Sequence, residues 1–141
     1  MSTGRRGFTL LEVMVVAFIL GLFATIIVPR LVGRTDEARR VKAIADLKSV
    51  AQALDLYRLD AGTYPTTEQG LDALVERPAV APVPARWNPR GYLDRAPLDP
   101  WGRPYAYVRA ADDRYHLKSF GADGAEGGDG AFADIDSNAD S

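Results

Sequence analysis

The sequence predicts an α+β fold, in which a long N-terminal helix packs on a small antiparallel sheet. Three observations support it: an almost uncharged apolar run, an amphipathic stretch after that run, and two strand-like segments nearer the C-terminus. The run covers Phe8–Val28, the amphipathic stretch extends from Asp36 to about Leu59, and the strand-like segments are Tyr105–Val108 and Tyr115–Ser119. The first two are long enough for helices, whereas the last two are short and flank a turn-like segment.

The apolar run has the properties of a retained membrane anchor. It is 21 residues long and contains a single charged residue, Glu12. A stretch of this length spans a bilayer as a helix. A short basic segment with Arg5 and Arg6 precedes it, and no small-residue cleavage site of the secretory type follows Val28. We therefore expect the run to stay in the protein.

The stretch after the anchor is expected to form an amphipathic helix. Its apolar side chains recur at intervals of three and four and make one stripe: Val41, Ile44, Leu47, Ala51, Leu54 and Tyr57. Pro29 has no backbone N–H and is expected to kink or loosen the helix, and Thr35 is expected to cap a fresh start. Together the two halves predict about fifty residues of helix, about 75 Å long at the usual rise per residue.

Turn residues at Ala61–Pro65 are expected to end this helix. Thr66 or Thr67 should then cap a short helix that extends through Leu71 to Val75. An irregular loop with four prolines is expected at residues 78–89, and a weak strand around Gly91–Leu93. Three aromatic residues are expected to pack the sheet against the helix: Trp101, Tyr105 and Tyr107.

Composition limits the class of protein. The 141 residues allow one anchor and one small domain, and the absence of cysteine excludes disulfides and thiolate metal sites. The formal net charge is −2, with basic and acidic residues interleaved, so the chain has no nucleic-acid-binding footprint. His116 is the single histidine, and it lies within a predicted strand without an evident catalytic partner. We expect a protein that is not an enzyme.

The segment RRG-FTLLEV resembles the N-terminus of type IV prepilins and type II secretion pseudopilins. The resemblance implies that a prepilin peptidase cuts between Gly7 and Phe8 and that Phe8 becomes N-methylated. Glu12 and Pro29 stand at the spacing of the family. The family interpretation is that Glu12 of an incoming subunit attracts the Phe8 amine of its neighbour. The alternative is that Glu12 lies near the bilayer surface and snorkels.

Further stretches extend the resemblance over nearly the whole chain. TYPTTEQGLDAL, DPWGRPYAY and SFGADGAEGG look like the major pseudopilin of type II secretion systems. This implies a type IV pilin-like fold and a major structural subunit that polymerises to drive export of folded proteins across the outer membrane. The implied partners are other copies of the chain in a helical homopolymer, minor pseudopilins, an inner-membrane assembly platform and the prepilin peptidase.

The resemblance also implies a domain organisation and a location. Residues 1–7 would be a removed leader, residues 8–35 a transmembrane and filament-core helix, and residues 36–141 a periplasmic globular domain on a single-pass inner-membrane anchor. Counting positive charges argues for the opposite orientation, because five basic residues follow the apolar run: Arg30, Arg34, Arg39, Arg40 and Lys42. The resemblance is preferred to the count.

An acidic, glycine-rich segment follows Lys118, and it contains no Lys or Arg. Clustered oxygens on a glycine-rich loop suit calcium, and the family implies a calcium site here. By position, Asp123 is the first ligand, with the backbone carbonyls of Phe120 and Ala125 assisting. The second aspartate is Asp129, with Asp134 as the alternative. A solvated acidic tail is the competing interpretation.

Two other functions stay open. One is a type IV pilus subunit, which usually closes a C-terminal disulfide that this chain cannot form. The other is a membrane-tethered monomeric calcium-binding module. Glu12 and the processing site distinguish a filament subunit from such a tether, because a tether needs neither.

Overall fold

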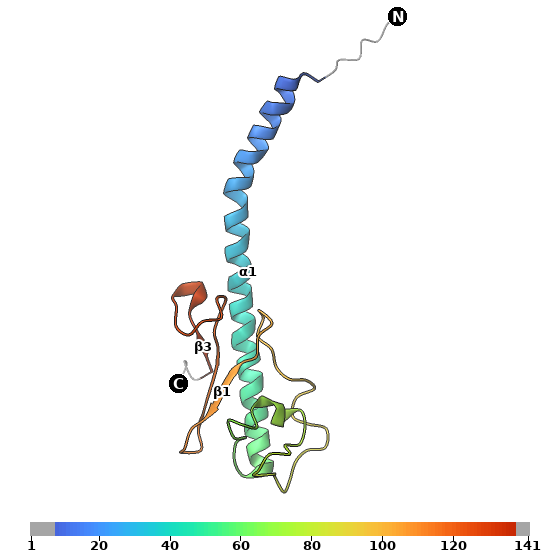
Figure 1. Cartoon of the computed structure of the whole chain (residues 1–141), viewed down its shortest axis with the longest axis vertical. Helices are drawn as coiled ribbons and strands as arrows, with labels where there is room; N and C mark the ends of the chain where they lie inside the picture. The colour runs from blue at the N-terminus through green and yellow to red at the C-terminus, as the bar shows by residue number, and fades with distance from the viewer. Residues whose placement is uncertain (1–7, 138–141) are drawn as a thin grey trace, which may run out of the picture. The chain divides into compact units, whose positions relative to one another are not determined.

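The computed structural model describes residues 8–137, except for the side chains of residues 23–34 and residue 131. The chain divides into two compact units, residues 1–35 and residues 36–141. The elements in order are α1 (Leu10–Ala61), the 3-10 helix η1 (Leu71–Leu74), β1 (Ala106–Arg109), β2 (Tyr115–Ser119), the 3-10 helix η2 (Gly130–Phe132) and β3 (Ile135–Asp136) (Figure 1). The long helix, which contributes to both units, and the small sheet give the predicted α+β class.

In the first unit, α1 begins with a side-chain cap that the sequence analysis missed. The N–H of Glu12 donates to Thr9 Oγ1 at 3.2 Å, so Thr9 is the N-cap and Glu12 the third helical residue. The apolar side chains described here, from Phe8 to Leu22, are exposed. In the described part of the chain, no helix is long and apolar enough to cross a membrane. The last side chains of the predicted span, residues 23–28, lie outside that part.

The helix does not restart after Pro29. It is helical from Leu10 to Ala61, so Thr35 lies within it and the predicted N-cap at Thr35 is wrong. The reason is that proline removes one amide donor and strains one turn, which a long helix tolerates as a local distortion. The prediction of about fifty residues of helix is confirmed by its 52 residues.

In the second unit, one face of α1 forms the centre of the core. Five residues spaced four, three, four and three apart lie on this face and are buried: Ala43, Leu47, Val50, Leu54 and Tyr57. The predicted stripe was partly wrong, because Val41 is 60% exposed and Ile44 37% exposed. At about 100° per residue Val41 and Leu47 lie about 120° apart around the helix, so a stripe drawn through both was too wide to be covered from one side.

The sheet lies along the C-terminal half of α1 (Figure 1). It has three antiparallel strands in the order β1-β2-β3, with Tyr107 opposite Leu117 and Ser119 opposite Ile135. Tyr105, Tyr107, Leu117 and Ile135 are buried in the core and Trp101 packs against it, as predicted for the three aromatic residues. The two-residue strand β3 was not predicted, because it is too short to show alternation.

The weak strand predicted around Gly91–Leu93 is not formed. Gly91 has a φ of 75°, and the N–H groups of Tyr92 and Leu93 both donate to the Leu74 carbonyl, at 2.7 and 3.0 Å. Two consecutive amides that share one acceptor break the alternation of a regular ladder, in which successive residues point to opposite sides. The segment instead closes a loop on η1.

The turn after α1 follows the prediction. Gly62, with a φ of 85°, donates to the Arg58 carbonyl and ends the helix. Thr66 and Gln69 then bond reciprocally, N–H to side chain, as a capping box that closes the turn before η1. The N-cap of η1 itself is Gly70, which makes no side-chain cap bond, so the predicted threonine cap of this helix is wrong. The helix that follows is a single 3-10 turn, shorter than predicted. Gln69 Nε2 also donates to the carbonyls of Val80 and Pro82, which orders the proline-rich loop.

Leu54→Ala is expected to destabilise the second unit by about 2–5 kcal/mol, because Leu54 is fully buried and its loss leaves a cavity. Leu59→Ala on the same helix is the matched control, because Leu59 is 80% exposed and its change should stay within about 0.5 kcal/mol. Urea unfolding of the full chain in detergent, followed by tryptophan fluorescence, measures both. Equal effects of the two changes would contradict the assignment of the buried face.

Candidate functional site

The predicted processing and assembly residues lie at the N-terminal end. Gly7 lies outside the described residues. Phe8 is 83% exposed, and Glu12 is exposed on the first turn of α1. A carboxylate in the first turn is favoured by the helix dipole. Pro29 lies within α1, and its side chain is outside the described part. The structure therefore presents Glu12 as an exposed acid near Phe8, among exposed apolar side chains.

The acidic segment after β2 forms a loop that folds closely on itself. Five of its glycines have positive φ: Gly121, Gly124, Gly127, Gly128 and Gly130. A Cβ on Gly121 would lie 2.9 Å from the Ala133 carbonyl oxygen, and one on Gly128 would lie 2.5 Å from that of Phe132. The N–H of Asp134 also donates to the Gly127 carbonyl at 3.2 Å. The first half of the loop thus lies against the second, which only glycine permits at these two positions.

The three predicted aspartates have different environments. Asp123 is exposed, and its Oδ1 accepts the N–H of Ala125 at 3.1 Å. Asp129 is exposed in extended backbone just before η2 and makes no side-chain cap bond. Asp134 is half-buried: its Oδ2 lies 3.4 Å from Lys118 Nζ, and within the described chain its buried Oδ1 has no hydrogen-bond partner. Asp134 is therefore the aspartate with an unsatisfied buried oxygen.

The predicted backbone ligands occupy the same loop. The Phe120 carbonyl accepts the N–H of Gly124 at 3.2 Å, and Ala125 is exposed on the next turn. Within residues 8–137 no group of three or more acidic, histidine or cysteine side chains is placed to hold a metal ion. A site made of two carboxylates and several carbonyls is a different kind of site, and its oxygen donors are those that calcium prefers.

Three basic side chains hold the loop in two different ways. Arg40, on α1, donates to the carbonyls of Gly130 and Ala133, and Arg103 donates to that of Gly121. Lys118 instead contacts carboxylates, with Nζ 2.5 Å from Glu126 Oε1 and 3.4 Å from Asp134 Oδ2. The hydrogen bond that Lys118 donates to Glu126 is the largest cause that raises the pKa of Lys118, and desolvation opposes it.

A buried carboxylate supports the base of the loop. The side chain of Asp99 is 1% exposed, and its Oδ1 accepts the N–H groups of Trp101 and Arg103 at 3.0 and 2.8 Å. Its Oδ2 accepts the Ser119 hydroxyl at 2.9 Å, and the Gly121 N–H donates to the same hydroxyl at 3.3 Å. Asp99 thus joins the turn after it to β2 and the loop. This role of Asp99 was not predicted from the sequence, although aspartate at the first position of a DPWG turn is a signal for it.

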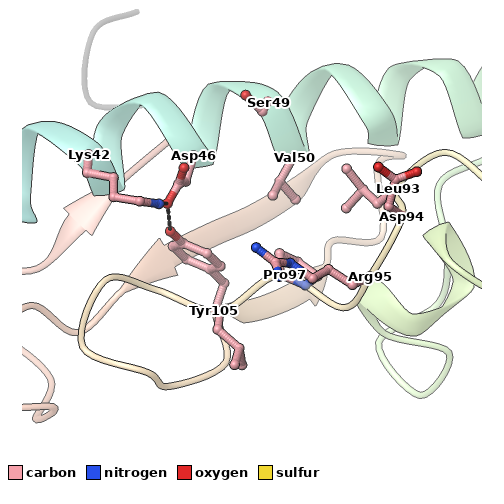
Figure 2. Close-up of a pocket in the computed structure, with 10 residues that line it drawn as sticks. Lys42, Asp46, Ser49, Val50, Leu93, Asp94, Arg95, Pro97 and Tyr105 are labelled. Carbon is pink, nitrogen blue, oxygen red and sulfur yellow. Dashed lines mark hydrogen bonds and ion pairs between the residues drawn. The ribbon is translucent and has the colours of Figure 1, made fainter.

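A pocket of about 250 Å³ lies between α1 and residues 93–98 (Figure 2). Lys42 Nζ and Asp46 Oδ2 form an ion pair at 2.5 Å on one wall, and the Tyr105 hydroxyl donates to Asp46 at 3.5 Å. Burial is the main cause that raises the pKa of Tyr105. The residues that line the pocket include no histidine or serine–base pair, and His116 is exposed on β2.

Comparison with known proteins identifies what the chain is similar to. Residues 30–138 match the family described as Type II secretion system (T2SS), protein G, and residues 2–28 match the prokaryotic N-terminal methylation motif. The type II secretion system core protein G of Pseudomonas aeruginosa is 49% identical over 93% of both chains. That of Vibrio cholerae is 48% identical over 93% of this chain and 90% of its own.

A solved structure shows the same fold. The crystal structure of the major pseudopilin from the type 2 secretion system of enterohaemorrhagic Escherichia coli superposes with a TM-score of 0.64 at 41% identity. The similarity covers 77% of this chain and 93% of that one. At this identity the likeness extends beyond the fold to the family.

Asp99→Ala is expected to destabilise the second unit by about 2–3 kcal/mol, because it leaves buried N–H and hydroxyl donors without an acceptor. Asp94→Ala is the matched control, because Asp94 is exposed nearby. Thermal unfolding of the full chain in detergent measures both. If Asp99→Ala unfolds at the same temperature as Asp94→Ala, the network does not support the loop.

Proposed function

Because the chain belongs to the protein G family of the type II secretion system, we propose that it is the major structural subunit of a pseudopilus. In this role it polymerises at the inner membrane and drives the export of folded proteins across the outer membrane. The observation that carries the proposal is that the family match and the methylation motif together span residues 2–138. The resemblance recognised in RRG-FTLLEV and DPWGRPYAY is thereby confirmed.

The N-terminal segment supplies the processing step of this proposal. A prepilin peptidase cuts between Gly7 and Phe8, and the new amino terminus of Phe8 is methylated. The methylation motif at residues 2–28 supports this step. The apolar residues from Phe8 to Val28 then hold the subunit in the inner membrane as a single-pass anchor, with residues 36–141 in the periplasm.

Glu12 is proposed to drive assembly. In a membrane or a filament core, the exposed carboxylate at the start of α1 is surrounded by apolar side chains, where an unpaired charge costs about 2.5–3.5 kcal/mol. The Phe8 amine of a neighbouring subunit is a partner of opposite charge, and every subunit supplies both groups. The homopolymer, minor pseudopilins and an inner-membrane platform are the proposed partners.

The alternatives are less well supported. A pilus subunit and a monomeric tether both have an apolar N-terminal helix, but the protein G family match over residues 30–138 favours a pseudopilin. The structural role is also preferred to catalysis, because the relatives are components of a secretion system. Loss of protein export, rather than of surface fibres, in a strain that lacks the gene distinguishes the pseudopilin from the pilin.

Glu12→Ala is expected to reduce export by more than about tenfold in a strain that lacks its own copy, because the Phe8 amine loses its partner. Glu76→Ala is the matched control, because it removes an exposed acid from the second unit. An exported enzyme assayed in the culture medium gives the result. As a control, mass spectrometry of the membrane fraction must show that each variant is cut before Phe8. If processed Glu12→Ala protein supports export at the wild-type level, the assembly role is contradicted.

We further propose that the loop at residues 120–136 binds calcium. The carbonyls of Phe120 and Ala125 and the carboxylate of Asp123 support this proposal, because they are oxygen donors on one loop. The glycines allow this loop its tight turns. Bound calcium would neutralise the acidic residues there and fasten the loop, which stabilises the folded state by mass action.

The environment of the carboxylates favours Asp134 over Asp129 as the second aspartate ligand. A buried carboxylate oxygen without a partner destabilises the folded state, and a bound cation offsets this cost. Asp134 Oδ1 is such an oxygen in the described chain. Asp129 is exposed and loses nothing by staying in water. The preference for Asp129 in the sequence came only from its position in the family resemblance.

Calcium is expected to raise the Tm of the full chain in detergent by roughly 10 °C, relative to the chelator EGTA, when its concentration is about 100 times the Kd. Asp123→Ala and Asp134→Ala should lose most of this rise, and Asp129→Ala should keep it. A rise lost only in Asp123→Ala and Asp129→Ala would return the assignment to Asp129. No rise in the wild-type chain would make the segment an acidic tail.

A further inference from the structure

Lys118 is held firmly at the edge of the acidic loop. It lies on β2, the central strand, opposite Ala106 of β1 and Asp136 of β3. Strands on both sides fix its backbone, and the side chain is only 24% exposed. The ammonium lies 5.0 Å from the centre of the Phe120 ring, close enough for a cation–π contact. The backbone position of Lys118 is therefore set by the sheet rather than by the loop.

The charge of Lys118 is directed at the loop carboxylates. It pairs with Glu126 and with Asp134, whereas Arg40 and Arg103 donate to loop carbonyls. The segment after Lys118 contains six acidic residues and no basic one. Among the described residues, the ion pairs of Glu126 and Asp134 are those with this one ammonium group.

The two oxygens of Asp134 lie in different environments. Oδ2 pairs with Lys118, and Oδ1 is buried without a hydrogen-bond partner in the described chain. A divalent cation that bound this carboxylate would repel an ammonium group at 3.4 Å from the same carboxylate. Calcium bound to Asp134 would therefore compete with the Lys118 ammonium.

We propose that Lys118 is an internal counter-cation of the loop, which holds Asp134 and Glu126 in the absence of calcium and must release Asp134 for calcium to bind. This inference rests on the calcium site proposed above. Lys118 then has two effects of opposite sign. It stabilises the calcium-free protein, and it weakens calcium binding, so the calcium concentration at which the loop becomes rigid depends on a residue outside the ligand set.

The proposal is tested with Lys118→Met, which removes the charge and keeps most of the apolar stem. In isothermal titration of the full chain in detergent with calcium chloride, Lys118→Met is expected to bind calcium roughly five- to tenfold more tightly than wild type. Its Tm in EGTA is expected to fall. Lys118→Arg should keep wild-type values, and Lys48→Met is the matched control for net charge, because Lys48 is exposed on α1.

A second measurement does not depend on how a variant folds. The chain has three lysines, at positions 42, 48 and 118, so amine acetylation of the wild-type protein can be followed at each by mass spectrometry. Calcium is expected to speed acetylation of Lys118 and to leave Lys48 unchanged. An unchanged or slower rate at Lys118 while calcium binds overturns the proposal.

The outcomes separate the two proposals. If wild type binds calcium and Lys118→Met binds it no more tightly, the counter-cation proposal is refuted and the calcium site stays in place. No calcium binding by either protein refutes both. Binding by Lys118→Met alone supports the counter-cation, because it means that the ammonium excludes calcium at the concentrations tested.

Discussion

The burial of one face of the C-terminal half of α1 is the constraint on which the second unit depends. Three short strands have no stable second layer of their own, and the sheet obtains one from this helix face. Tyr107 of β1, Leu117 of β2 and Ile135 of β3 each reach the same core as Leu47 and Leu54. Because this core fixes all three strands, it also fixes the points at which the connecting loops begin and end.

The acidic loop depends on the core through a chain of polar contacts. Asp99 is buried and accepts the hydroxyl of Ser119 at the end of β2, and the same hydroxyl oxygen accepts the N–H of Gly121 in the loop. Arg103 and Arg40 then hold loop carbonyls from two sides. These contacts use backbone acceptors and leave the carboxylates of the loop for charged partners, of which Lys118 is one.

The two parts of the proposed function are therefore carried by separate units. The first unit presents exposed apolar side chains and Glu12, which suit contacts with lipid or neighbouring helices. The second unit has its own core and a loop suited to a hard cation. Changes in the acidic loop should therefore alter the stability of one unit without removing the groups proposed for assembly in the other.

The sequence by itself determined the long helix, the two main strands and the family, because each is encoded locally by periodicity or by a contiguous motif. Only the tertiary structure decided which helix face is covered, since Val41 and Leu47 look alike until a sheet packs on one of them. It also decided that Asp99 is buried, that β3 pairs with β2, and that Lys118 meets Asp134. These contacts join residues distant in sequence, and no local pattern specifies which of several acids a folded chain brings to one ammonium.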